Sequence, residues 1–229
     1  MAGQAAAKKR IGVVLPSSNT VLEPLIQGAL AGTGITAHFT RLGVVDVTLD
    51  AASMAQFEMQ KHLEAARLLA DAAVDVLIWG GTSSSWLGVA RDREWCDTVQ
   101  RETGIPAGTC VLEMNRRLID LGVSRIGLVT PYTLDVQHRI IANYKGMGFE
   151  CVGHAHHGGT LSKDYAAISP ASVAQMVRRV AQTHPRAILI MCTNLHGAEE
   201  AAALEAELGI PVIDSAMATL WAGLRQLTL

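Results

Sequence analysis

Two segments of the chain correspond residue for residue: Leu77-Ile78-Trp79-Gly80-Gly81-Thr82 and Ile188-Leu189-Ile190-Met191-Cys192-Thr193. Each begins as a short apolar run, which is typical of a buried strand, and ends in a hydroxyl-bearing residue. The flanking triplets repeat as well: Arg10-Ile11-Gly12 and Gly104-Ile105-Pro106 return as Arg125-Ile126-Gly127 and Gly209-Ile210-Pro211. The repeat predicts a duplicated unit in which Gly81 and Cys192 occupy equivalent positions.

Strand and helix patterns alternate along the chain. The predicted strands span residues 11–15, 37–42, 74–79, 126–130, 150–154 and 187–191. The predicted helices span residues 54–72, 109–121, 134–147, 170–183, 198–208 and 216–227. Such alternation predicts mostly parallel sheets covered by helices. We therefore expect an α/β fold of two tandem, pseudo-symmetric lobes with the active-site cleft between them. The first lobe is placed at residues 1–115, joined by a C-terminal helix at 216–229, and the second lobe at residues 116–215.

Composition restricts the class of protein. Hydrophobic residues make up 49% of the 229 residues and charged residues 17%, which is typical of a compact enzyme. The net charge of −2 gives no basic surface for nucleic acid or for an anionic membrane. No apolar run approaches the roughly 20 residues that span a bilayer. The four cysteines, Cys96, Cys110, Cys151 and Cys192, lack metal-type spacing. We expect a cytoplasmic protein with reduced thiols and a small-molecule partner, and the sequence leaves homo-oligomer formation open.

Four loops that are rich in hydroxyls and amides follow predicted strands. They begin at Pro16, Gly80, Pro131 and Cys192. Ligands of open parallel sheets bind beyond the carboxyl ends of the strands, where backbone N–H groups favour a carboxylate. For any one loop, helix capping by Ser, Thr or Asn is an equally good interpretation. Four such loops, related by duplication, favour an anion-binding pocket.

Cys192 is the strongest candidate for a reactive group. It ends an apolar strand, and we expect Thr193-Asn194 to open a helix directly after it. That placement lowers a thiol pKa from about 8.5 and suits proton transfer or nucleophilic attack. The alternative, a buried apolar thiol, is the commoner fate of cysteine, and we expect it for the other three.

Other site motifs are weak or missing. The sequence contains no G-x-G-x-x-G, P-loop, G-x-S-x-G or H-E-x-x-H pattern. His154, His156 and His157 cluster at a strand end without a nearby acidic residue. We therefore expect no metal site. The tryptophans are interpreted as core residues or pocket walls.

Several of these segments resemble the aspartate/glutamate racemase superfamily, and within it the branch of maleate isomerases and arylmalonate decarboxylases. The segments most similar to maleate isomerases are Val14-Leu15-Pro16-Ser17-Ser18-Asn19-Thr20, Thr130-Pro131-Tyr132-Thr133, Cys192-Thr193-Asn194-Leu195 and Ala218-Thr219-Leu220-Trp221. The resemblance covers nearly the whole chain. It implies a duplicated two-lobe fold that needs no metal or organic cofactor.

The chain departs from the maleate-isomerase pattern at two positions. Racemases and maleate isomerases of this superfamily use two cysteines, one from each lobe, and the first would fall at Gly81. This departure speaks against a mechanism that adds the first cysteine to a double bond. An asparagine expected near Asp164 is replaced, with Tyr165 in its place.

Gly81-Thr82-Ser83 together with one second-lobe cysteine is instead similar to arylmalonate decarboxylases. On this resemblance, Thr82, Ser83 and Tyr132, with backbone N–H groups near Thr193, hold one carboxylate in a dioxyanion hole. The other carboxylate lies against apolar walls, and Cys192 protonates the resulting enediolate from one face. The wall residues are Leu42, Val44 and Trp86, and the further substrate-binding candidates are Pro16, Ser17, Asn19, Gly81, Thr193 and Asn194.

Three functions follow from these observations. The first choice is a cofactor-independent decarboxylase of an aryl- or disubstituted malonate. The alternative is a maleate cis–trans isomerase, or a racemase of a small dicarboxylate, hydantoin or amino acid, in which Tyr132 or water replaces the missing thiol. The third is a carboxylate-binding protein without turnover. We also expect Gly81→Cys to restore a second thiol and to add racemising ability.

Overall fold

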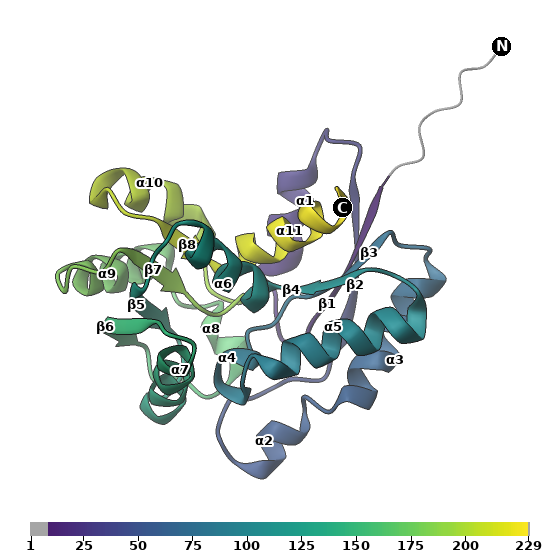
Figure 1. The fold of residues 1–229 in the computed structure, drawn as a ribbon, viewed down its shortest axis with the longest axis horizontal. Coiled ribbons are helices and arrows are strands. Elements are labelled where there is room, and N and C mark those ends of the chain that lie inside the picture. Colours follow the sequence, from purple (N-terminus) through teal and green to yellow (C-terminus); the bar gives the residue numbers. More distant parts are fainter. Residues whose placement is uncertain (1–8, 229) are drawn as a thin grey trace.

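The structure is a computed structural model that describes residues 9–228, and it consists of two α/β lobes that lie side by side (Figure 1). Each lobe is built on a four-stranded parallel sheet, with strand orders β2-β1-β3-β4 and β6-β5-β7-β8. The first sheet contains β1 (Arg10–Pro16), β2 (Thr36–Leu42), β3 (Val76–Trp79) and β4 (Ala107–Thr109). The second contains β5 (Arg125–Thr130), β6 (Glu150–His156), β7 (Ala187–Ile190) and β8 (Val212–Asp214). The predicted fold class is confirmed.

Helices connect the strands. The helices of the first half are α1 (Leu22–Leu30), α2 (Ala51–Ala55), α3 (Met59–Asp71), α4 (Ser84–Leu87), α5 (Ala90–Thr103) and α6 (Cys110–Asp120). Those of the second half are α7 (Leu134–Gly146), α8 (Ser162–Tyr165), α9 (Pro170–Ala181), α10 (Ala198–Leu208) and α11 (Ser215–Gln226). Among the helices of residues 9–228, none has the length and apolarity that crossing a bilayer requires.

Some elements differ from the sequence prediction. The predicted helix at 54–72 is two helices, α2 and α3, because the backbone is extended at Glu58 (φ −64°, ψ 137°). Strands β4 and β8 were not predicted, since three residues are too few to show a period. Helix α1 was missed because Pro24 and Gly28 interrupt its pattern, and α5 because most of its residues are polar.

The register of the two sheets reproduces the sequence repeat. Trp79 at the end of β3 and Ile190 at the end of β7 take the same register against the central strands β1 and β5. The next residue of each segment donates its N–H to the central strand, at 2.8 Å in the first lobe and 2.9 Å in the second. Gly81 and Cys192 follow directly, so the fold places them at equivalent strand ends.

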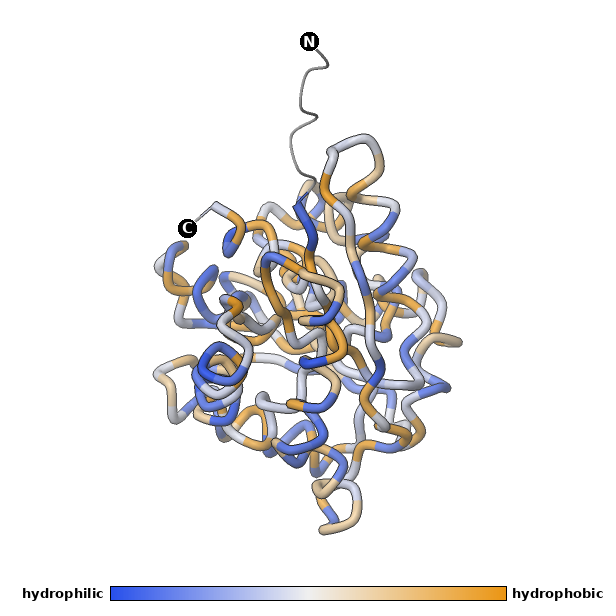
Figure 2. The backbone as a smooth tube through the Cα atoms, turned by 90° about the vertical axis from the view of Figure 1, so that its right-hand side faces the viewer, coloured by the Kyte–Doolittle hydropathy of each residue, from blue (hydrophilic) through white to orange (hydrophobic). Residues whose placement is uncertain are grey.

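The main hydrophobic core runs through both lobes, and a second cluster lies beneath α1 and α11. In that cluster, Val13 and Ile78 of the first sheet pack with Ile26 of α1 and Leu220 of α11. Figure 2 shows the hydrophobic segments running through the middle of the molecule. Although α11 follows β8 of the second lobe, it therefore packs on the first sheet. The lobe boundaries at 115/116 and 215/216 stay predictions, and their outermost residues, 1–8 and 229, lie outside the described residues.

Candidate active site

A pocket of about 330 Å³ lies between the lobes, at the carboxyl ends of both sheets. Its walls come from the loops that follow β1, β2 and β3 on one side, and from the loops after β5 and β7 together with α8 on the other. Every lining residue is uncharged: Pro16, Asn19, Val44, Val47, Phe57, Trp79, Gly81, Thr82, Ser83, Trp86, Tyr132, Ser162, Tyr165, Cys192, Thr193 and Asn194. The position matches the cleft expected from the duplication.

The fold brings the predicted site residues together, with two exceptions. Ser17 and Leu42 do not line the pocket, whereas all the other predicted residues do. The Ser17 hydroxyl accepts the N–H of Val44 at 3.2 Å, and Leu42 is buried in the core. Both residues therefore support the wall from behind rather than form it.

Sequence reasoning missed five lining residues as site residues: Val47, Phe57, Trp79, Ser162 and Tyr165. Four of them lie in loops or short helices, and among these only Tyr165 stands at a position that the family resemblance singles out. Trp79 had a usable signal, since side chains two residues apart on a strand point to the same face. Its position two residues before Gly81 therefore places it beside the pocket.

Hydrogen-bond donors gather at one end of the pocket. The Thr82 Oγ1 and the Tyr132 hydroxyl share a hydrogen bond of 2.7 Å between the lobes. The Ser83 hydroxyl accepts the indole N–H of Trp79 at 3.3 Å. Within residues 9–228, the backbone N–H groups of Thr82, Ser83 and Thr193 donate to no other backbone carbonyl. Uncommitted N–H groups at such an end can bind a carboxylate or an oxyanion.

The two asparagines of the pocket join loops from opposite lobes. The Asn19 side chain accepts two backbone N–H groups at the start of α1 and donates to Thr193 Oγ1 at 3.0 Å. Thr193 in turn donates to the carbonyl of Gly80 at 2.9 Å. Asn194 accepts the N–H of Thr20 at 2.9 Å and donates to a carbonyl of α8 at 2.7 Å. These amides fix the shape of the pocket, and their contact with substrate stays a prediction.

Cys192 is buried, and its surroundings keep the thiol protonated. Burial raises the pKa of Cys192 to about 12, and hydrogen bonds from the Asn194 N–H and the Tyr132 hydroxyl offset only part of this. The expected helix directly after Cys192 is wrong, because α10 begins only at Ala198. A thiol with so high a pKa is a proton donor at neutral pH rather than a thiolate nucleophile.

A buried carboxyl group lies behind Cys192. The Asp214 Oδ1 accepts the N–H of Met217 at 2.9 Å and so caps α11, while its Oδ2 has no hydrogen-bond partner among residues 9–228. Burial raises the pKa of Asp214 to about 7. Its negative charge also contributes to the raised thiol pKa of Cys192.

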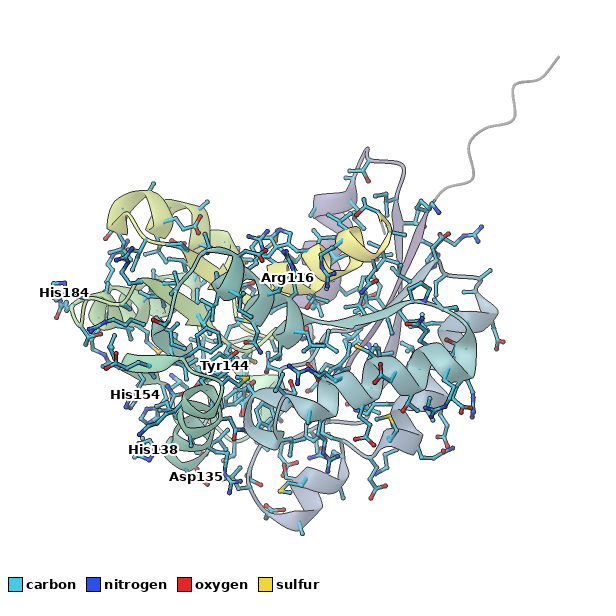
Figure 3. All side chains as sticks on the ribbon, viewed as in Figure 1. Arg116, Asp135, His138, Tyr144, His154 and His184 are labelled. Atoms are coloured by element: carbon cyan, nitrogen blue, oxygen red, sulfur yellow. The ribbon has the colours of Figure 1, made fainter. Side chains whose placement is uncertain are left out.

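None of the clustered histidines, His154, His156 and His157, lines the pocket. Figure 3 shows His154, with His138 beside it, on the outer side of the second lobe, and the two ring centroids are 5.9 Å apart. Within the described residues, no group of three or more His, Cys, Asp or Glu side chains is arranged to hold a metal ion.

Comparison with known proteins gives consistent matches over nearly the whole chain. The family profile described as arylmalonate decarboxylase matches residues 13–229. Arylmalonate decarboxylase of Bordetella bronchiseptica is 25% identical over 224 residues, which cover 97% of this chain and 92% of that protein. Maleate isomerase of Nocardia farcinica is 24% identical over 231 residues, which cover 96% and 91%.

A solved structure matches the fold as well. It is a liganded arylmalonate decarboxylase variant in which a glycine is changed to cysteine and a cysteine to serine. It superposes with a TM-score of 0.84 at 23% identity, over 95% of this chain and 92% of that chain.

Proposed function

The chain belongs to the arylmalonate decarboxylase family, and we propose that it is a cofactor-independent decarboxylase of an aryl- or disubstituted malonate. The observation that carries the proposal is the single thiol of the pocket. Cys192 lines the pocket from the second lobe, and the equivalent residue of the first lobe is Gly81. The arylmalonate decarboxylase structure compared above carries two substitutions, glycine to cysteine and cysteine to serine. Its parent protein therefore also has one glycine and one cysteine at these two positions.

The donor end of the pocket suits the carboxylate that stays on the product. The backbone N–H groups of Thr82 and Ser83 come from the first lobe, and the hydroxyl of Tyr132 meets them from the second lobe through its hydrogen bond with Thr82. As the reaction proceeds, charge grows on this carboxylate, and each donor then stabilises the transition state more than the substrate. One donor of this kind is worth roughly 3–4 kcal/mol.

The uncharged walls suit the carboxylate that leaves. No cationic side chain lines the pocket within residues 9–228, and Val44 and Trp86 present apolar surface. Removing a carboxylate from water disfavours its charge, and cleavage of the bond between its carbon and the α-carbon relieves this by releasing neutral CO2. The bonding electron pair moves to the α-carbon and onto the retained carboxylate as an enediolate.

Protonation completes the reaction. The Cys192 thiol gives its proton to the α-carbon, and the enediolate returns to a carboxylate. The raised pKa of the Cys192 thiol keeps the donor protonated before each turnover. The resulting thiolate takes up a proton from solvent. Because the thiol stands on one side only, we expect a single product enantiomer.

Maleate isomerisation is the second candidate. It is supported by the 24% identity to a maleate isomerase and by the similar loop Pro16-Ser17-Ser18-Asn19. The same neutral donors would bind a small dicarboxylate. An amino-acid racemase is less well supported, because no acidic side chain of the described residues lines the pocket to pair with an α-ammonium group.

Proton NMR of the purified protein with 2-methyl-2-phenylmalonate in D2O tests the proposal. We expect 2-phenylpropionate that carries deuterium at the α-carbon. Cys192→Ser should lose about two to four orders of magnitude in rate, as expected for loss of a general acid. Cys151→Ser, in β6 and outside the pocket, is the matched control and should retain the activity.

The isomerase alternative has its own readout in the same experiment. Conversion of maleate to fumarate, with every malonate unchanged, would replace the proposed function by the second candidate. Full malonate turnover by Cys192→Ser would refute the role of the thiol.

A further inference from the structure

We propose that Trp79 determines the substrate specificity of this pocket, because its indole both excludes a side chain at position 81 and closes off a second cavity behind the pocket. The class of substrate, an arylmalonate, rests on the proposed function above. The size of the aryl group that fits depends only on the shape of the pocket and can be measured separately by binding.

The first observation is steric. A Cβ atom added to Gly81 would lie 2.2 Å from Cζ2, 2.6 Å from Cε2 and 2.8 Å from Cη2 of the Trp79 indole. All three distances are shorter than an ordinary non-bonded contact between carbon atoms. The φ angle of Gly81 is not positive, so its backbone conformation does not require glycine. Glycine is required at position 81 because the Trp79 indole leaves no room for a Cβ atom.

The second lobe provides an internal comparison. Ile190 occupies the position equivalent to Trp79, and the residue two positions further on is Cys192. A branched aliphatic side chain there is compatible with a thiol in the pocket. The two lobes thus carry matched pairs: Ile190 with Cys192 in one, and Trp79 with Gly81 in the other.

The third observation is a second, partly open cavity, whose empty space is about 310 Å³ when its opening to solvent is included. Three residues line both this cavity and the active-site pocket: Phe57, Trp79 and Ser83. The indole of Trp79 is the largest of these side chains, and it is 1% exposed. Its ring lies edge-to-face against His62 on the far side, with 4.5 Å between centroids. Trp79 is therefore the partition between the two spaces.

The second cavity contains polar groups without partners. Within residues 9–228, the buried His62 Nδ1 and Trp95 Nε1 have no hydrogen-bond partner. Both residues line this cavity, and neither lines the active-site pocket. Burial lowers the pKa of His62 to about 4, so the imidazole is neutral at pH 7. Arg91 and Asp92 also line this cavity, beside the apolar side chains of Phe57, Met59 and Leu87. A flat apolar ring fits against the apolar part of this lining.

Shortening Trp79 should therefore extend the active-site pocket into the second cavity. Trp79→Leu is expected to raise the preference for a 2-naphthyl over a phenyl substituent, in kcat/KM on 2-methyl-2-arylmalonates, by about tenfold or more. Trp95→Leu is the matched control, because it enlarges the second cavity and leaves the partition in place. It should leave the preference unchanged.

The same partition corrects the sequence-based expectation for Gly81→Cys. The single substitution has no room beside the indole, so we expect no gain of α-proton exchange. Trp79→Ile/Gly81→Cys copies the pair of the second lobe. This double variant is expected to exchange the α-proton of both enantiomers of 2-phenylpropionate with D2O. Equal exchange by the single and double variants would contradict the steric argument.

Binding separates this proposal from the proposed function. Calorimetry with phenylacetate and 2-naphthylacetate measures the size limit without any turnover. For Trp79→Leu, we expect the affinity for 2-naphthylacetate relative to phenylacetate to rise by about tenfold or more over wild type. If this shift occurs and no variant releases CO2, the specificity role stands and the decarboxylase function falls.

Trp79→Phe removes the benzo ring that contacts position 81 while keeping an aromatic core residue, and it serves if Trp79→Leu does not fold. An unchanged preference in folded Trp79→Leu or Trp79→Phe would overturn the proposal, whether or not the protein decarboxylates malonates.

Discussion

Cys192 illustrates how burial selects between two kinds of thiol chemistry. A thiolate nucleophile needs a lowered pKa, whereas a proton donor needs the thiol form at working pH. The buried setting of Cys192 raises its pKa to about 12. We therefore propose that Cys192 donates a proton and does not act as a nucleophile.

The pH dependence of turnover follows from this raised pKa. Because the thiol form persists up to about pH 12, kcat should not fall through ionisation of Cys192 between about pH 7 and about pH 9. Initial rates at saturating malonate across this range provide the check. A loss of kcat with an apparent pKa near 8.5 that disappears in Cys192→Ser would contradict the account.

Tyr132 permits a second test at the residue scale. Tyr132→Phe removes the hydroxyl that bonds to Thr82 and faces the pocket. We expect kcat to fall by about two to three orders of magnitude, as for the loss of one oxyanion donor. The control is Tyr144→Phe, since the buried Tyr144 hydroxyl has no partner among the described residues. Equal rates for the two variants would show that the Tyr132 hydroxyl is not a donor to the substrate.

At the scale of elements, the repeated segments predict strand ends well because the signal is local. The paired positions of Gly81 and Cys192 follow from the sequence repeat, and the sheet register places them equivalently. Strands β4 and β8 and helix α5 carry weak periodicity, and their positions are set by the sheets they join or cover. No local pattern indicates that Phe57 or Tyr165 reaches the pocket; only the family resemblance points to position 165, and segments far apart in sequence bring both residues there.

The contact between α6 and α11 supports a stability prediction. Glu113 of α6 has a 1% exposed side chain and accepts a hydrogen bond from Arg225 of α11 at 2.9 Å. Arg225→Met should lower the free energy of unfolding by about 1–3 kcal/mol, because it removes a charged partner from a buried acceptor.

Arg178→Met is the matched control for that prediction. Arg178 pairs with Glu207 at the surface, where such a pair is worth about 0–1 kcal/mol. Urea unfolding of both variants provides the comparison. A smaller loss for Arg225→Met than for Arg178→Met would show that the burial of Glu113 does not matter.

At the scale of the whole molecule, two buried carboxyl groups make folding stability depend on pH. Burial raises the pKa of Asp214 to about 7 and that of Asp92 to about 6. Each group is protonated more readily in the folded chain than in the unfolded chain. Its contribution is therefore fully present below about pH 4 and is lost as the pH rises through the folded-state value.

Asp214→Asn isolates one of these contributions. Asparagine retains a capping oxygen for α11 but cannot ionise. The stability of the variant relative to wild type should therefore rise as the pH increases from about 5 to about 8, by an amount on the order of 3 kcal/mol at most. His62, whose pKa is lowered, changes the stability with pH in the opposite direction. This contribution is the same in Asp214→Asn and in wild type, so it cancels in the difference. Urea unfolding across this range checks the prediction, and a difference that stays constant or falls would contradict it.

The fold as a whole places one thiol on one side of a pocket between two lobes, and stereochemistry tests this arrangement most directly. The measurement is the enantiomeric composition and α-deuterium content of 2-phenylpropionate formed from 2-methyl-2-phenylmalonate in D2O. We expect one enantiomer that carries a single α-deuterium. A racemic product, formed while added single-enantiomer 2-phenylpropionate keeps its configuration, would contradict one-sided protonation by Cys192.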